Sequence, residues 1–271
     1  MSTNGAEMLV TADWLLSHLE DQDLRILDMR NPMKYMSGHI PGSVLVPYER
    51  VVDSSPSRPY LNVASKDEIE GLLSDSGVNN ESLIVVYGDL GGSAAARLFW
   101  TLELYGANVK ILNIPFVAWM SRGLPVTREI IRPEPSKFVA KKGTDLRISS
   151  EQIHAKISNT NMIIVDTRSQ EEYDGTIESD HKPGRIPGSI NIPWNEAVGG
   201  MDLIFKNKDN LEKVFESRGV TRDKEVVCYC HVGERSSHTF LALRVLGYPK
   251  VKIYDRSFAE WSSKPELPIE V

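Results

Sequence analysis

The amino-acid sequence repeats itself once, and this repeat limits the chain to folds built from two similar halves. Residues 89–106 correspond to residues 230–247, and both segments contain a Gly-containing loop followed by an apolar helical pattern. The segment Gly-His-Ile-Pro-Gly-Ser at 38–43 returns as Gly-Arg-Ile-Pro-Gly-Ser at 184–189. We therefore interpret the chain as two copies of one fold in tandem.

Within each half, β-prone segments alternate with helical patterns. In the first half, residues 24–30, 82–87 and 109–112 favour strands, whereas residues 65–73 and 93–105 carry apolar side chains at helical spacing. This alternation predicts an α/β fold in which each half has a mostly parallel central sheet with helices on both faces. Such sheets place their functional sites at the carboxyl ends of the strands, so we expect the important residues in the loops there.

A polar stretch that contains Pro and Gly joins the two halves, and it shows no sustained hydrophobic period. This composition is typical of a linker. We therefore predict a first domain at residues 1–124, a linker at 125–145 and a second domain at 146–271.

Composition narrows the class of protein. A length of 271 residues suggests about two domains, and the hydrophobic and charged contents of 41% and 25% are typical of soluble globular proteins. The net charge of −6 argues against a general nucleic-acid-binding or anionic-membrane surface. No window reaches the ~18 consecutive apolar residues of a membrane span. With only two cysteines, one of them argued below to be a free thiolate, we expect a cytoplasmic protein with neither a nucleic-acid nor a membrane partner.

The prediction of function depends on Cys230. This residue ends the β-prone segment 226–230, and a loop containing Gly233 separates it from a helix predicted at 238–246. Backbone N–H groups and the helix dipole at a helix N-terminus favour a nucleophilic thiolate at Cys230. Arg235 is close enough along the chain to add a positive charge over the same loop. We therefore expect Cys230 to attack a substrate that carries an anionic group.

Other residues limit how the two halves work. Cys228 lies inside the predicted strand, and we interpret it as a buried structural residue. Two cysteines spaced as Cys-x-Cys complete neither a Cys-rich zinc site nor a Cys-x-x-Cys redox motif, so we expect no metal. The first half has Asp89 where the second has Cys230, and Ala94 where the second has Arg235. We therefore expect the first half to be catalytically inactive and structural.

These motifs together resemble those of the tandem-domain rhodanese family. They are the Asp-x-Arg segments at 28–30 and 166–168, the repeated Ile-Pro-Gly-Ser turns, and the Cys-terminated strand before a Gly loop. The resemblance covers residues 9–267. In that family the first domain is inactive, and a cysteine of the second cycles through a persulfide, which implies this role for Cys230. The Cys230 loop (residues 230–235) is similar to that of bacterial and archaeal thiosulfate sulfurtransferases with a Cys-x-x-Gly-Glu-Arg sequence.

The resemblance implies transfer of the sulfane sulfur of thiosulfate to cyanide, a thiol or a protein thiol through a Cys230 persulfide. Ping-pong kinetics are expected and no cofactor is required. The implied substrate ligands lie in or next to the Cys230 loop: His231, Val232, Gly233, Glu234, Arg235 and Ser236. We expect Asp166 and Arg168 to brace this loop structurally. Ser236 and Ser237 precede the predicted helix, where serine commonly caps.

Three other functions stay open. 3-Mercaptopyruvate sulfurtransferases share the tandem fold and the cysteine but typically have a small, neutral loop. Rhodanese-fold phosphatases need Cys-x5-Arg around a phosphate, whereas Cys230 and Arg235 are separated by one residue fewer. A non-catalytic sulfur-relay or binding protein is the third. The arginine that vertebrate thiosulfate enzymes carry after Asp-x-Arg corresponds to Glu172 here, which leaves Arg235 as the main cation.

Overall fold

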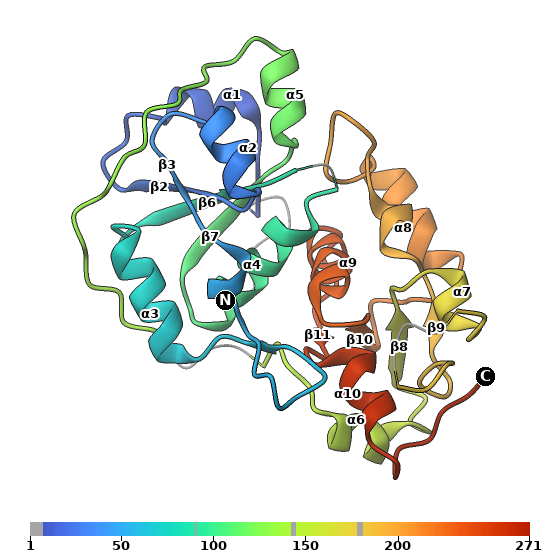
Figure 1. Cartoon of the computed structure of the whole chain (residues 1–271). Helices are drawn as coiled ribbons and strands as arrows, with labels where there is room; N and C mark the ends of the chain where they lie inside the picture. The colour runs from blue at the N-terminus through green and yellow to red at the C-terminus, as the bar shows by residue number, and fades with distance from the viewer. Residues whose placement is uncertain (1–7, 90, 142–144, 178–180) are drawn as a thin grey trace.

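The structure is a computed structural model that describes residues 8–89, 91–141, 145–177 and 181–271. Strands and helices alternate through both halves (Figure 1). The first-half strands are β1 (Leu9–Val10), β2 (Leu24–Asp28), β3 (Ser43–Leu45), β4 (Val52–Asp53), β5 (Asn62–Val63), β6 (Leu83–Tyr87) and β7 (Asn108–Leu112). The first-half helices are α1 (Ala12–Ser17), α2 (Pro32–Ser37), the 3-10 helix η2 (Tyr48–Arg50), α3 (Lys66–Asp75), α4 (Ser93–Leu104) and α5 (Phe116–Ser121).

The second half repeats this order with fewer strands. Its strands are β8 (Met162–Asp166), β9 (Ile190–Asn191), β10 (Glu225–Tyr229) and β11 (Val251–Ile253). Its helices are α6 (Ser150–Lys156), α7 (Gln170–Tyr173), the 3-10 helix η3 (Trp194–Ala197), α8 (Lys208–Glu216), α9 (Glu234–Val245) and α10 (Ser257–Ser263).

Each half contains one parallel sheet. The strand order is β1-β7-β6-β2-β3 in the first half and β11-β10-β8-β9 in the second, and the short antiparallel pair β4-β5 lies apart from both. In the second sheet, Cys228 of β10 lies opposite Val165 of β8, and Tyr229 lies opposite Asp166. The predicted α/β class with mostly parallel sheets is confirmed. The register brings the end of β8 beside the residue that precedes Cys230.

Both faces of each sheet are buried. In β6, Ile84 and Val86 belong to one hydrophobic cluster, whereas Val85 and Tyr87 belong to another. Successive side chains of a strand point to opposite faces, so this alternation means that packed side chains cover both faces. Strand β10 divides its side chains between two clusters in the same way. The near-continuous apolar strands of the sequence follow from this double burial.

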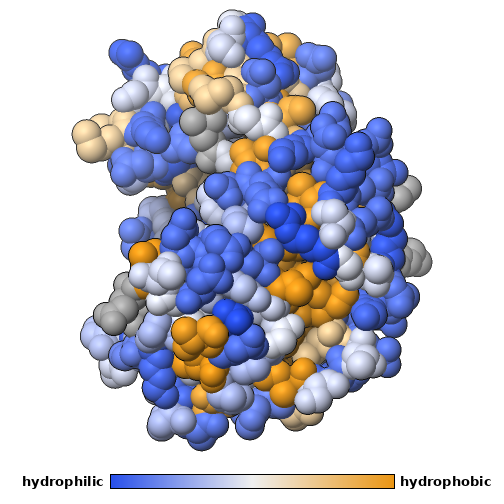
Figure 2. Space-filling view, turned by 90° about the vertical axis from the view of Figure 1, so that its right-hand side faces the viewer, coloured by the Kyte–Doolittle hydropathy of each residue, from blue (hydrophilic) through white to orange (hydrophobic). Residues whose placement is uncertain are grey.

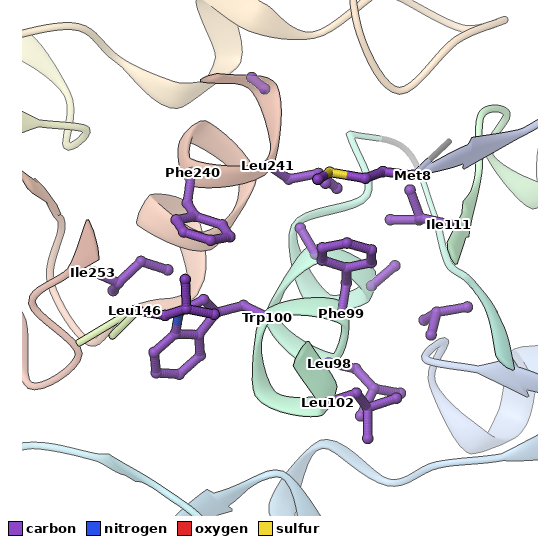
Figure 3. Packing of buried hydrophobic residues seen from close by; sticks show 14 of the residues in the cluster. Met8, Leu98, Phe99, Trp100, Leu102, Ile111, Leu146, Phe240, Leu241 and Ile253 are labelled. Atoms are coloured by element: carbon purple, nitrogen blue, oxygen red, sulfur yellow. The ribbon is translucent and has the colours of Figure 1, made fainter. Parts of the chain in front are cut away.

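The largest hydrophobic cluster belongs to both halves. It is centred on α4 and α9, which contribute Phe99, Trp100, Phe240 and Leu241 (Figure 3). All four are fully or almost fully buried. Each such side chain contributes roughly 1.5–3 kcal/mol relative to an exposed one. The two halves are therefore joined by a continuous core.

Equivalent residues of the two halves meet across this interface. Ser93 Oγ, at the start of α4, donates to Glu234 Oε1, at the start of α9, at 2.6 Å, and the two residues are 141 positions apart. Near the other end, Arg244 Nη2 donates to Glu103 Oε1 at 3.0 Å, again 141 positions apart. The N-terminal ends of α4 and α9 meet each other, and so do their C-terminal ends. The two helices therefore run side by side in the same direction, with their positive N-termini together.

The segment after α5 runs along the first half rather than through solvent (Figure 1). Thr127 and His39 exchange backbone hydrogen bonds of 2.9 Å, and the Ser136 N–H donates to Ser74 O at 3.1 Å. Residues 127–141 of the predicted linker are therefore docked onto the first half, whereas Asp145 pairs with Lys252 of the second half.

Hydrophilic residues prevail on the face that Figure 2 shows, and hydrophobic residues gather there in separate patches. Among the described residues, no helix has the length and apolar character needed to cross a membrane.

Candidate active site

Cys230 lies directly after β10, at the carboxyl edge of the second sheet, and is 1% exposed. The Gly233 N–H donates to Cys230 Sγ at 3.1 Å. The Cys230 N–H donates to Ser257 Oγ at 3.1 Å. Although Ser257 Oγ also lies 4.0 Å from the sulfur, its hydroxyl donates to Tyr254 O at 2.8 Å. The Gly233 amide is therefore the direct donor to the sulfur, and it lies at the N-terminus of α9.

Gly233 is required by both conformation and space. Its φ of +91° lies in the region that glycine adopts readily and other residues do not. A Cβ atom here would lie 2.6 Å from Arg97 Nη1 and 2.6 Å from Asp255 O. The Arg97 side chain and the Asp255 backbone therefore pack directly against Gly233 and leave no room for a side chain there.

Helix α9 begins four residues earlier than predicted, at Glu234 rather than at residue 238. Gly233 is its N-cap, and no side chain of the described residues caps it. The expectation that Ser236 and Ser237 cap the helix is therefore wrong. Both lie within the first turn, and their hydroxyls donate back to Gly233 O at 3.1 and 2.7 Å, as serine does inside a helix. Contact between Ser236 and a donor stays a prediction.

His231 and Val232 form the outer part of the Cys230 loop and are half-buried. The start of α10 holds this part of the loop in place. The Phe258 N–H donates to Cys230 O at 3.0 Å, and the Ala259 N–H donates to His231 O at 3.1 Å. Helix α10 thus holds the loop through its backbone.

Arg235 is bound by Glu172, which is a partner that the sequence did not reveal. Its Nη1 and Nη2 donate to the two carboxylate oxygens of Glu172 at 2.6 and 2.9 Å. Arg235 also lines a cavity of about 330 Å³ whose other walls include Trp194 and Glu171. Position 172, which corresponds to an arginine in the vertebrate thiosulfate enzymes, therefore holds a carboxylate that compensates the charge of Arg235.

Burial alone would raise the pKa of Glu172, but hydrogen bonds from Arg235 and Ser169 lower it to about 2. Because this pKa is below the ordinary value of about 4.3, the pair stabilises the fold above about pH 4 and loses that effect as the pH falls towards 2. We expect Glu172→Gln to lower the free energy of unfolding by about 2 kcal/mol at pH 7 and by about half as much near pH 3. Urea unfolding of both proteins across this range measures the difference.

Glu196→Gln is the matched control, because Glu196 pairs with Arg218 at 2.8 Å where both side chains are about one-third exposed. A pair in that setting contributes about 0–1 kcal/mol. An equal cost of Glu172→Gln at pH 7 and pH 3 would contradict the assignment of the low pKa to this ion pair.

Asp166 and Arg168 form a buried brace beside the loop. The Arg168 N–H and Nε both donate to Asp166 Oδ1 at 3.0 Å, and Arg168 Nη2 donates to Gly184 O at 2.7 Å. Asp28 and Arg30 repeat this arrangement in the first half, where Arg30 Nη2 donates to Gly38 O at 2.8 Å. Because the half without the cysteine has the same brace, the brace supports the fold of each half.

The first half has no sulfur at the corresponding place. Asp89 follows β6 there, and Lys34 Nζ donates to its Oδ2 at 2.6 Å on the surface. A cavity of about 270 Å³ adjoins this pair, with Arg30 and Phe116 among its walls.

A family model for the Rhodanese-like domain matches this chain twice, over residues 11–122 and 149–264. The chain belongs to the rhodanese family. The predicted resemblance is thereby confirmed, and the two matches correspond to the two halves that the internal repeat defines.

Individual rhodanese relatives cover nearly the whole chain. A sulfur carrier protein of Thermus thermophilus, TtuD, is 34% identical over 97% of this chain and 96% of its own length. The thiosulfate sulfurtransferase of Pseudomonas aeruginosa is 32% identical over 95% of this chain and 94% of its own. The crystal structure of Escherichia coli SseA, a 3-mercaptopyruvate sulfotransferase, is similar with a TM-score of 0.83 at 27% identity, covering 92% of this chain and 98% of that one.

In this rhodanese the first half also reaches the Cys230 loop, through Arg97, which sequence reasoning missed. Arg97 lies in α4, is fully buried and forms a 2.6 Å ion pair with Asp255 Oδ1. Its Nη1 donates to Gly233 O at 3.4 Å. An arginine in the middle of a strongly apolar helix is the signal that identifies such a residue, because arginine is almost never fully buried without a partner.

Proposed function

We propose that this rhodanese is a sulfurtransferase that takes the sulfane sulfur of thiosulfate onto Cys230 and passes it to a thiophilic acceptor such as cyanide or a thiol. The observation on which this rests is the Cys230 sulfur at the N-terminus of α9, with the Gly233 amide donating to it at 3.1 Å. An amide and a helix N-terminus both favour negative charge on the sulfur. The sulfurtransferase names of full-length relatives support the same reaction class.

The reaction consists of two displacements at sulfur. The Cys230 thiolate attacks the outer sulfur of thiosulfate, the S–S bond of thiosulfate breaks, and sulfite leaves with the electron pair. The acceptor then attacks the outer sulfur of the Cys230 persulfide and regenerates the thiolate. With cyanide the product is thiocyanate. A covalent intermediate between two half-reactions gives ping-pong kinetics.

Burial of Cys230 supports a persulfide carrier. The thiol is 1% exposed, and an added sulfur lies about 2.05 Å further out, as in other S–S bonds. The acceptor attacks this outer sulfur and therefore need not reach the buried Cys230 sulfur itself. The phosphatase alternative is weakened, because the loop is one residue short and Glu172 holds both terminal nitrogens of Arg235.

The identity of the donor depends on how the anionic end is held. Glu172 compensates the positive charge of Arg235. Backbone amides must therefore contribute more to binding the negative charge of the donor than the sequence alone indicated. This compensation favours 3-mercaptopyruvate, with its single carboxylate, as the second candidate donor. The similarity to the Escherichia coli 3-mercaptopyruvate sulfotransferase supports it as well.

We expect turnover with thiosulfate and cyanide to exceed turnover with 3-mercaptopyruvate, together with a mass gain of one sulfur (~32 Da) on thiosulfate-treated protein. Sulfite release, thiocyanate formation and intact-protein mass spectrometry measure these results. A clearly higher kcat/KM with 3-mercaptopyruvate would identify that compound, rather than thiosulfate, as the donor. Absence of sulfur on Cys230 with both donors would contradict the proposed function.

A further inference from the structure

We propose that Arg97 of the cysteine-free half is a positioning residue for the sulfur site, because its ion pair with Asp255 holds the Gly233 amide against Cys230 Sγ. This deepens the proposed function, since it takes Cys230 as the residue that carries sulfur. The first half then has more than a structural role, because it supplies a charged side chain behind the Cys230 loop.

The ion pair is a junction between the two halves. Arg97 Nη2 lies 2.6 Å from Asp255 Oδ1, and the two side chains are 0% and 1% exposed. The other carboxylate oxygen of Asp255 accepts from the Val63 N–H at 2.8 Å and from Arg147 Nη2 at 3.4 Å. Asp255 is thus held by two segments of the first half and one of the second. A carboxylate with this many partners gives Arg97 a fixed anchor.

Arg97 and Asp255 form the wall against which Gly233 packs. The guanidinium nitrogen Nη1 donates to Gly233 O at 3.4 Å, and the Gly233 N–H donates to Cys230 Sγ at 3.1 Å. Gly233 therefore contacts Arg97 through its carbonyl oxygen and the Cys230 sulfur through its N–H group. The absence of room for a Cβ at Gly233 shows how tightly this wall is packed. Ser236 and Ser237 also donate to Gly233 O, so Arg97 acts mainly by packing: a shorter or apolar side chain there would open the space beside Gly233 and let its amide turn away from the sulfur.

Charged and titratable groups approach Cys230 from both halves. They are Tyr48, Arg97, Glu172, Cys228, His231, Glu234, Arg235 and Asp255.

Most of these groups are neutral or compensated. Burial raises the pKa values of Tyr48 and Cys228, which stay uncharged near neutral pH. Glu172 compensates Arg235. Burial opposes the charge on Arg97, but Asp255 keeps its pKa above the usual value. Asp255 is shared between Arg97 and Arg147, and Glu234 accepts from Ser93, so charges of both signs surround the sulfur and the position of the Gly233 amide is the specific effect of Arg97.

The test is the pH dependence of Cys230 alkylation by iodoacetamide in the full-length chain, with the site identified by peptide mass spectrometry. We expect Arg97→Met to slow alkylation at pH 7 about tenfold and to move the midpoint about one pH unit upwards, because alkylation follows the thiolate fraction. Arg97→Lys, which keeps the charge but not the two-pronged geometry, should give an intermediate midpoint.

Arg244→Met is the matched control. Arg244 forms the 3.0 Å ion pair with Glu103 that also joins α4 to α9, but at the opposite end of these helices. We expect this variant to melt at a lower temperature with an unchanged alkylation profile. Equal shifts in Arg97→Met and Arg244→Met would overturn the proposal, because they would reflect the interface in general.

Removing Arg97 alone leaves a buried carboxylate short of a partner, which can prevent folding. The double variant Arg97→Met/Asp255→Asn removes both charges and provides a second test, with the same upward midpoint shift expected. A wild-type profile in the folded single or double variant would overturn the proposal. Alkylation requires no sulfur donor, so wild-type protein that alkylates normally but takes up no sulfur would contradict the proposed function alone.

Discussion

Cys230→Ser is expected to lose sulfur transfer entirely, with a fall in turnover of at least about 10³-fold and no mass gain on treatment with thiosulfate. A serine hydroxyl in the same place stays protonated near neutral pH, even with the Gly233 amide as a donor. Serine is close to cysteine in size, so the fold should persist. Intact-protein mass spectrometry after donor treatment measures the loss directly, and steady-state thiocyanate formation measures it in turnover.

Cys228→Ser is the control for this result, because Cys228 lies two residues earlier and is fully buried in β10. A buried hydroxyl without a ready partner costs roughly 1–3 kcal/mol, so this variant should be less stable. It should still gain one sulfur per chain. Sulfur loading that survives in Cys230→Ser and disappears in Cys228→Ser would refute the assignment of the nucleophile.

Gly233→Ala is expected to lower the free energy of unfolding by about 2–4 kcal/mol and to reduce sulfur loading at least about tenfold. The left-handed backbone at φ +91° accounts for part of the cost. The larger part comes from a methyl group 2.6 Å from both Arg97 Nη1 and Asp255 O, which forces the buried wall or the loop to move. Chemical denaturation and donor-dependent mass gain measure the two effects.

Gly247→Ala separates conformation from packing. Gly247 follows the same helix with φ +85°, and no described atom lies within 4 Å of a Cβ built there. Only the conformational cost of about 1 kcal/mol applies, and sulfur loading should be unchanged. If the two alanine variants were equally stable, the packing of Arg97 against Gly233 would have no energetic importance.

The fold was predictable because its determinants are local or periodic. The strand and helix patterns recur in both halves, and loops with glycine mark the ends of strands, so the parallel sheets and the position of Cys230 followed directly. The start of α9 was misplaced because residues 234–237 are polar. Their hydroxyls and charges are satisfied within the turn or across the interface, which hides the helical pattern.

The partners of the site residues were not predictable in the same way. Glu172 and Arg235 are separated by 63 positions, and which carboxylate meets which guanidinium depends on how two loops face each other. The ion pair of Arg97 with Asp255 depends on the packing of one half against the other. Periodicity assigns residues to faces, but such pairs arise only when the halves dock.

The meeting of equivalent residues across α4 and α9 has a consequence for self-association. Contacts between equivalent positions are typical of isologous homodimers, so two copies of one half present the right surface to pair with each other. In a homodimer of the second half, however, Glu234 would face Glu234 and Arg244 would face Arg244. Within the fused chain these residues meet Ser93 and Glu103 instead. Divergence of the two halves has therefore made the correct partner complementary and the identical partner repulsive, which selects the fused pair over a symmetric dimer.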